Sequence, residues 1–278
     1  MSSRLAVLGA LLALAVPGPR ALAQHLPAGA APAPAPAGSP AEPGEEEVEA
    51  LPCRPTIACT AEFVPAGYLE VEAGYTGRQL GGGFQHSTPV ILKLTVLEPL
   101  QLQVGTNGWV AQRAESAYLD DFLVAAKLRL AREEGASPAL AFSAGLSIPT
   151  RSGQQGYVPT YDAQLVAYAS KDLGPIHADL NLALNVLDLQ GAGIRQPWVA
   201  LSVSTELAHR YIPMVEGYAF GSGGDLAASD HGLLVALGLA FTRQVVMDVG
   251  GDWGMIGQDR RFSLFVGLTV LTPRLWTP

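Results

Sequence analysis

The sequence predicts an all-β fold: an antiparallel transmembrane β-barrel of about 12 strands, with short periplasmic turns and longer extracellular loops. Segments of alternating apolar and polar residues run from about residue 67 to the C-terminal end, joined by links that are short and long in strict alternation. Beyond residue 23, no stretch approaches the roughly 18 consecutive apolar residues of a membrane-spanning helix. The short links are 97–99, 132–138, 171–175, 209–213 and 242–244; the long ones are 76–89, 107–120, 149–160, 187–197, 221–230 and 251–260.

Composition supports a membrane protein. Of the 278 residues, 49% are hydrophobic and 15% are charged, whereas soluble proteins are about 25% charged. The 17 Lys and Arg against 25 Asp and Glu give a net charge of −8. This acidic balance argues against a nucleic-acid partner.

Residues 1–23 have the features of a secretory signal peptide. Arg4 precedes an apolar run from Leu5 to Val16, and the segment closes with small residues up to Ala23. This pattern is typical of a cleaved leader. We therefore expect export, and for a barrel the expected location is the cell outer membrane.

Residues 24–66 are predicted to form a Pro/Ala-rich periplasmic tether, because they hold few large apolar residues. Binding of a partner by the tether is the alternative. Cys53 and Cys59 are the two cysteines, and in an exported chain they are expected to form a disulfide. No further Cys or His lies nearby to complete a metal site, so none is predicted.

Residues 67–278 are predicted to form the barrel. The clearest alternation lies in 176–186, where the apolar residues occupy the even positions and the polar ones the odd. Successive strand residues point to opposite faces, so Leu182 is expected to face lipid and Asn181 the lumen. The apolar faces carry no charge, as expected where a buried Arg or Lys costs about 2 to 4 kcal/mol.

Alternation also fits a soluble barrel with an apolar interior. The polar face distinguishes the two kinds of barrel. Its residues are often small, and the chain has only three lysines, whereas the outside of a soluble barrel usually carries many. Small polar residues suit a narrow lumen. Four tryptophans near strand ends are expected in aromatic girdles: Trp109, Trp198, Trp253 and Trp276.

Charged residues of the polar face are the candidate functional residues. The lumen candidates are Glu70, Glu72, Lys93, Asp121, Lys127, Arg129, His177, Asp179, Asn181, Asp248 and Arg261. With Asp162, Glu206 and Glu216, lumen acids outnumber bases, which favours cations or neutral solutes. The alternative is a ladder of paired charges that blocks the pore.

Catalysis is not predicted. His177 and Asp179 share a face and could orient an imidazole, but no serine joins them within that strand. A motif such as Gly-x-Ser-x-Gly is also missing from the sequence.

Three short stretches carry a family resemblance: 145–150 (GLSIPT), 246–251 (VMDVGG) and 265–269 (FVGLT). Through them residues 67–276 resemble the outer-membrane family labelled "MetA-pathway of phenol degradation", whose members are described as transporters. Relatives tend to follow Pro-Thr with Gly, where this chain has Arg151 and Ser152. The resemblance implies passage of small solutes, aromatic ones among them, and carries over no catalytic residue.

The sequence thus predicts a passive outer-membrane channel that is not an enzyme, needs no cofactor, and has lipid and a small solute as its partners. A lipid-modifying barrel enzyme and a non-conducting structural barrel are the alternatives.

Overall fold

A computed structural model describes residues 48–80, 83–112, 117–151 and 157–277, which belong to one compact unit. The predicted signal peptide and residues 24–47 of the predicted tether lie outside these residues. The described strands are β1 (Leu69–Leu80), β2 (Gly83–Ser87), β3 (Val90–Leu97), β4 (Leu100–Thr106), β5 (Trp109–Gln112), β6 (Tyr118–Leu119), β7 (Phe122–Ala131), β8 (Ala139–Ile148), β9 (Asp162–Leu173), β10 (Ile176–Leu187), β11 (Ile194–Thr205), β12 (Tyr211–Phe220), β13 (Asp230–Thr242), β14 (Val245–Ile256) and β15 (Asp259–Leu271).

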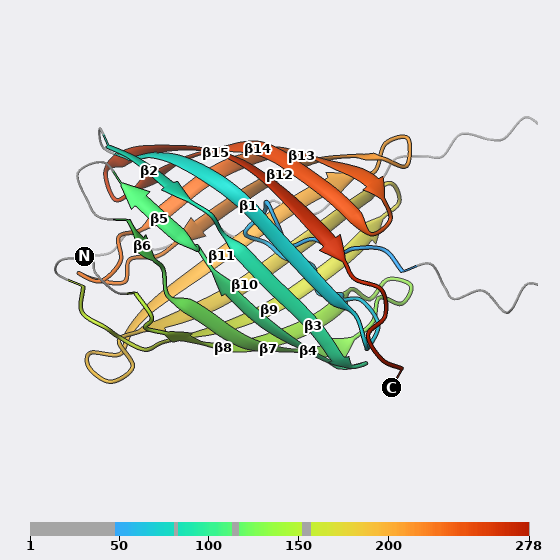
Figure 1. Cartoon of the computed structure of the whole chain (residues 1–278), viewed down its shortest axis with the longest axis horizontal. Coiled ribbons are helices and arrows are strands. Elements are labelled where there is room, and N and C mark those ends of the chain that lie inside the picture. Colours follow the sequence, from blue (N-terminus) through green and yellow to red (C-terminus); the bar gives the residue numbers. More distant parts are fainter. Residues whose placement is uncertain (1–47, 81–82, 113–116, 152–156, 278) are drawn as a thin grey trace, which may run out of the picture. The chain divides into compact units, whose positions relative to one another are not determined.

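These strands form a closed antiparallel barrel with 12 strand positions, which confirms the predicted fold class. From β7 to β15 each strand pairs with the next one along the chain, β1 pairs with both β2 and β3, and β1 closes the ring by pairing with β15 (Figure 1). Three positions are each made of two strands, β2 with β3, β4 with β5 and β6 with β7. The first break includes Pro89, which lacks a donor, the second includes Gly108, which has a φ of 64°, and the third lies at Asp120 and Asp121.

The two rims differ as predicted. Links 98–99, 132–138, 174–175, 206–210 and 243–244 form one rim, called here the turn rim. The opposite rim, called the loop rim, includes 149–161, 188–193 and 221–229. The chain therefore has the short-turn and long-loop asymmetry of membrane barrels.

Some strands run further into the loop rim than predicted. The link 251–260 was expected to be a long loop, yet β14 and β15 continue until only Gly257 and Gln258 join them. Glycine misled the prediction, because Gly254 lies in a strand where a Cβ would meet the Arg261 side chain. Glycine within a strand marks a close approach as often as a loop.

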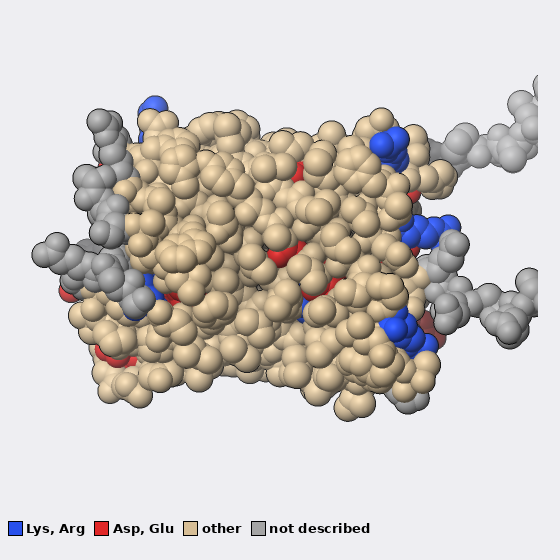
Figure 2. Space-filling view, viewed as in Figure 1, with Lys and Arg blue, Asp and Glu red and all other residues tan. Residues whose placement is uncertain are grey.

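The outer face of the barrel is apolar. On β10, 53% of Leu182 is exposed while only 1% of its neighbour Asn181 is, so the predicted phase of this strand is confirmed. The wall seen in Figure 2 is largely free of charge between the rims, apart from a few patches. Such a face suits hydrocarbon and not water. No helix of the described residues is long and apolar enough to cross a membrane.

One tryptophan contradicts the girdle prediction. Trp109 and Trp253 are exposed, but Trp198 is buried inside the barrel. Its neighbours on β11, Pro197 and Val199, face outward, so the period of two turns Trp198 inward.

Candidate functional site: a segment of the chain inside the barrel

Residues 48–66, called here the plug, lie inside the barrel. At one end the backbone nitrogen of Ala50 donates to Arg243 in the β13–β14 turn, and just past the other end that of Gly67 donates to Thr95 near the end of β3. The plug thus enters and leaves at the turn rim. The prediction of a periplasmic tether is therefore wrong for residues 48–66. Small residues such as Ala58 and Ala61 are buried there, because a crowded interior leaves no room for long side chains.

Wall carboxylates receive the plug backbone. Glu72 on β1 accepts hydrogen bonds from the backbone nitrogens of Cys53 (2.9 Å) and Arg54 (2.8 Å). Glu216 on β12 accepts from those of Ile57 (2.8 Å) and Ala58 (2.6 Å). The plug has no strand or helix to satisfy its own donors, so buried wall acceptors do so.

Neutral wall groups continue the same pattern further along the plug. The amide of Asn181 accepts from the backbone nitrogen of Cys59 (2.7 Å) and donates to its carbonyl oxygen (2.9 Å). The hydroxyl of Ser170, on β9, accepts from the nitrogen of Ala61 (2.6 Å). The plug therefore has a defined register against the wall.

Three predicted lumen cations bind plug carbonyl oxygens. Lys93 donates to Leu51 (2.6 Å) and pairs with Glu70 (2.7 Å) and Glu72 (2.6 Å). Lys127 donates to the carbonyl of Thr60, and its Nζ lies 4.4 Å from the ring centre of Tyr168.

Arg129 donates to the carbonyl of Phe63 (2.7 Å) and lies 4.2 Å from the Phe63 ring centre. All three cations thus bind carbonyl oxygens of the plug, and Lys93 also pairs with wall carboxylates.

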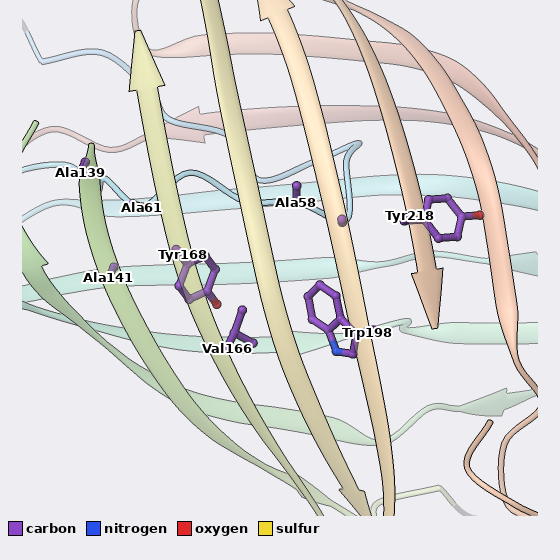
Figure 3. Packing of buried hydrophobic residues seen from close by; sticks show 9 residues of the cluster. Ala58, Ala61, Ala139, Ala141, Val166, Tyr168, Trp198 and Tyr218 are labelled. Carbon is purple, nitrogen blue, oxygen red and sulfur yellow. The ribbon is translucent and has the colours of Figure 1, made fainter. Parts of the chain in front are cut away.

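Apolar packing completes the seat of the plug. Ala58 and Ala61 pack against Tyr168, Trp198 and Tyr218, which project inward from the wall (Figure 3). The indole nitrogen of Trp198 donates to Asn185 (3.2 Å).

The predicted disulfide is present. Cys53 and Cys59 are joined, with their Cα atoms 4.6 Å apart. The bridge closes the innermost turn of the plug and makes no covalent link to the wall.

Arg54 and Asp248 meet beside this turn. The Nη2 atom of Arg54 lies 4.0 Å from Oδ1 of Asp248 on β14. The guanidinium lies against Gly74 and Gly267, where a Cβ would collide with Arg54 atoms. These glycines are register partners on β1 and β15. Because neither carries a side chain, the wall leaves room here for the arginine.

Arg261, another predicted lumen residue, binds wall carboxylates toward the loop rim. Arg261 pairs with Asp252 and with Asp230 (3.0 Å), while the Tyr218 hydroxyl donates to Asp252 (2.7 Å). These contacts tie β12 to β13, β14 and β15.

Asp121 binds residues on both sides of 152–156, which lie outside the described residues. It accepts from the backbone nitrogens of Thr150 (2.9 Å) and Arg151 (2.8 Å) and from the hydroxyl of Tyr157 (2.9 Å). Burial and the adjacent Asp121 carboxylate raise the pKa of Tyr157 to about 12. At the turn rim, hydrogen bonds from Lys171 and the Asp172 backbone hold the pKa of the Glu133 carboxyl below its ordinary value.

His177 lies in an acidic cluster on the inner side of the turn rim. Its ring nitrogens contact Asp172 (2.6 Å) and Asp179 (3.1 Å). A serine does join them across the strands, since Ser170 pairs with Asp179 in register. Ser170 donates to Asp179 (2.5 Å) and not to the imidazole. A nucleophile needs its base in direct reach, so this arrangement does not activate the serine.

Cavities lie on both sides of the plug. A turn-side cavity of about 390 Å³ is lined by residues that include Asp179, Met214 and Asp248. A loop-side cavity of about 540 Å³ is lined by residues that include Asp121, Gln164 and Asn185. Arg54 and Thr56 line both, so the innermost turn of the plug separates the two spaces.

The site thus groups most predicted lumen residues around the plug and leaves Asp121 and Arg261 at the loop rim. Sequence reasoning placed Glu216 in the lumen but not among the site candidates, and it missed Ser170 and Arg54. The excess of acids over bases was the available signal, since unpaired buried acids require donors. Ser170 gave no signal, because its contact depends on cross-strand register.

No family model matches the chain, and no curated protein matches it. Among solved structures, it is similar to an outer membrane channel from Pseudomonas putida F1, with 14% identity over 83% of this chain and 100% of that one and a TM-score of 0.58. The KdgM porin matches at 10% identity over 72% of this chain and 98% of its own, with a TM-score of 0.46. The monoaromatic hydrocarbon channel CymD matches at 8% identity over 75% and 88%, with a TM-score of 0.42. At these identities, the match to the Pseudomonas putida channel shows an outer-membrane barrel fold. It does not confirm the MetA-pathway family.

Proposed function

We propose that this chain is an outer-membrane channel through which small solutes, aromatic ones among them, diffuse passively with a weak preference for cations. The turn rim would face the periplasm and the loop rim the exterior, as in other barrels of this architecture. The observation that carries the proposal is a polar lumen with a cavity on each side of a plug that, apart from its continuation into β1, is held in place by non-covalent contacts.

The plug supports a closed resting state. Hydrogen bonds and ion pairs exchange with water at a small net cost per bond, so the plug can shift as a unit without breaking a covalent bond. Solute passage then requires movement near Arg54, where the two cavities approach each other.

Charge supports the cation preference. The turn-side cavity is lined by more acids than bases: Glu49, Glu62, Asp172, Asp179, Glu206 and Asp248 against Arg54 and His177. The loop-side cavity has Asp120, Asp121 and Asp162 against Arg54 and Arg151. Fixed negative charge along a low-dielectric path favours cations over anions.

A non-conducting structural barrel is the second candidate, and the plug itself favours it. Conductance of the purified protein in a planar bilayer, with the reversal potential measured across a salt gradient, separates the two. We expect cation-preferring conductance that increases in Glu216→Gln, a variant that loosens the plug.

If neither the wild type nor Glu216→Gln conducts, and swelling assays with neutral aromatics and sugars are also negative, the result would support the structural barrel. Anion preference would contradict the charge argument alone. Turnover of labelled phospholipid would instead favour a lipid-modifying enzyme.

A further inference from the structure

Asp248 differs from the other acids around the plug. Its side chain is 4% exposed, yet among the described residues neither carboxylate oxygen has a hydrogen-bond donor. Glu72 and Glu216, equally buried, each accept from two plug nitrogens. A buried carboxylate without a donor is costly, so this position favours an additional cationic group.

The structure indicates the shape of cation that fits. Arg54 presents a planar guanidinium to Asp248, but 4.0 Å separates Nη2 from Oδ1, which is beyond hydrogen-bond distance. The space it occupies exists because Gly74 and Gly267 carry no Cβ. Arg54 is therefore a tethered cation that lies beside Asp248 without satisfying it.

Asp248 is part of the lining of the turn-side cavity of about 390 Å³. The rest of this lining is mixed: Met214 and Val246 are apolar, while Ser202 and Ser204 carry hydroxyls. Pockets for small molecules begin at about 300 Å³ and combine apolar walls with a few polar groups. The cavity thus offers one buried charge, an apolar wall and neutral acceptors.

We propose that the turn-side cavity binds a small organic cation, an ammonium or guanidinium group on an apolar body, with Asp248 as its counter-ion and Arg54 as its internal competitor. This inference rests on the proposed channel function, for which it names the solute class. The bound cation supplies the hydrogen bonds that Arg54 does not make, and its apolar body covers Met214 and Val246.

Equilibrium binding tests the proposal without requiring conduction. Full-length protein in neutral detergent is titrated calorimetrically with phenethylammonium chloride and, separately, with the neutral analogue 2-phenylethanol. We expect the ammonium to bind about tenfold or more tightly than the alcohol, since a desolvated charge-assisted pair contributes more than a neutral contact.

Three variants locate the site. Asp248→Asn should weaken ammonium binding about tenfold or more, whereas Asp225→Asn, which removes an exposed acid of the loop rim outside this cavity, should change it by less than about threefold. Arg54→Met should strengthen binding, because it removes the competitor and keeps much of the side-chain volume.

Equal affinity for the ammonium and the alcohol would overturn the proposal, as would wild-type affinity in Asp248→Asn. If Asp248→Asn does not fold, unchanged or weaker binding in Arg54→Met overturns it independently. Ammonium binding by a protein that conducts nothing would contradict the channel function alone. Conductance without ammonium binding would contradict only this inference.

Discussion

The carboxylate of Glu216 accepts a hydrogen bond from the backbone nitrogen of Ala58, 158 positions earlier in the chain, at 2.6 Å. Glu216 is fully buried and its other oxygen accepts from Ile57. This lumen acid thus holds a segment of the chain inside the barrel.

Glu216→Gln should loosen the plug at this point. A glutamine side chain retains one acceptor oxygen, so one of the two amides loses its acceptor, at about 1 to 3 kcal/mol. Hydrogen exchange of the Ile57 and Ala58 amides should accelerate, while exchange in β10 stays unchanged. Glu206→Gln on the exposed turn rim is the control. Unaltered exchange at both amides would contradict the anchoring role.

The disulfide should restrict the plug. Cys53 and Cys59 are 6 positions apart, and closing so short a loop removes unfolded-state entropy worth about 2 kcal/mol. A Cys53→Ser, Cys59→Ser double variant should therefore show faster amide exchange across 53–61 in an intact barrel. Thiol labelling of unreduced, denatured wild type should find no free cysteine. Two labelled thiols would rule out the bridge.

Leu182→Arg should destabilise the barrel by about 2 to 4 kcal/mol, because it places a charge on the lipid face near the middle of β10. Leu182→Met keeps the volume and polarity class and should cost far less. Refolding titrations into lipid vesicles measure both. Similar losses for the two variants would show that this face does not contact hydrocarbon.

The contact between Tyr157 and Asp121 should weaken at high pH. The pKa of Tyr157 rises from 10.0 to about 12 in the fold, so the folded chain binds the phenol proton more tightly than the unfolded chain does. The resulting stability is complete below pH 10 and is lost as the pH rises through 12. Absorbance of the phenolate should titrate late in the wild type and earlier in Asp121→Asn. An unshifted titration in that variant would contradict the contact.

The barrel was predictable because its signals are local. A period of two fixes the face of each residue, and links of different length mark the two rims. The period of two also predicts that Trp198 points inward, as observed. The prediction of a girdle position relied instead on the general preference of tryptophan for strand ends, and it was wrong for this residue. Glycines such as Gly254 obscured the strand ends, because packing against Arg261 and loop formation favour the same residue.

The plug was not predictable in this way. Residues 48–66 have no periodic pattern, and apart from Glu70 and Glu72 on the following strand β1, their anchors come from strands far along the chain. Their position also sets Asn181 apart from an ordinary lumen residue. Because Asn181 makes two hydrogen bonds with Cys59, Asn181→Arg would displace the plug. Only the unbalanced lumen acids hinted at a buried backbone.

The return of the plug to the turn rim has a consequence for assembly. Its two ends lie beside the β13–β14 turn and the end of β3, and β1 follows directly before closing the ring against β15. A hairpin-like segment of this kind can enter a finished barrel from one side, with no chain end drawn across the membrane. Wall closure and filling of the lumen are therefore separable events, and the barrel can be completed before its interior is occupied.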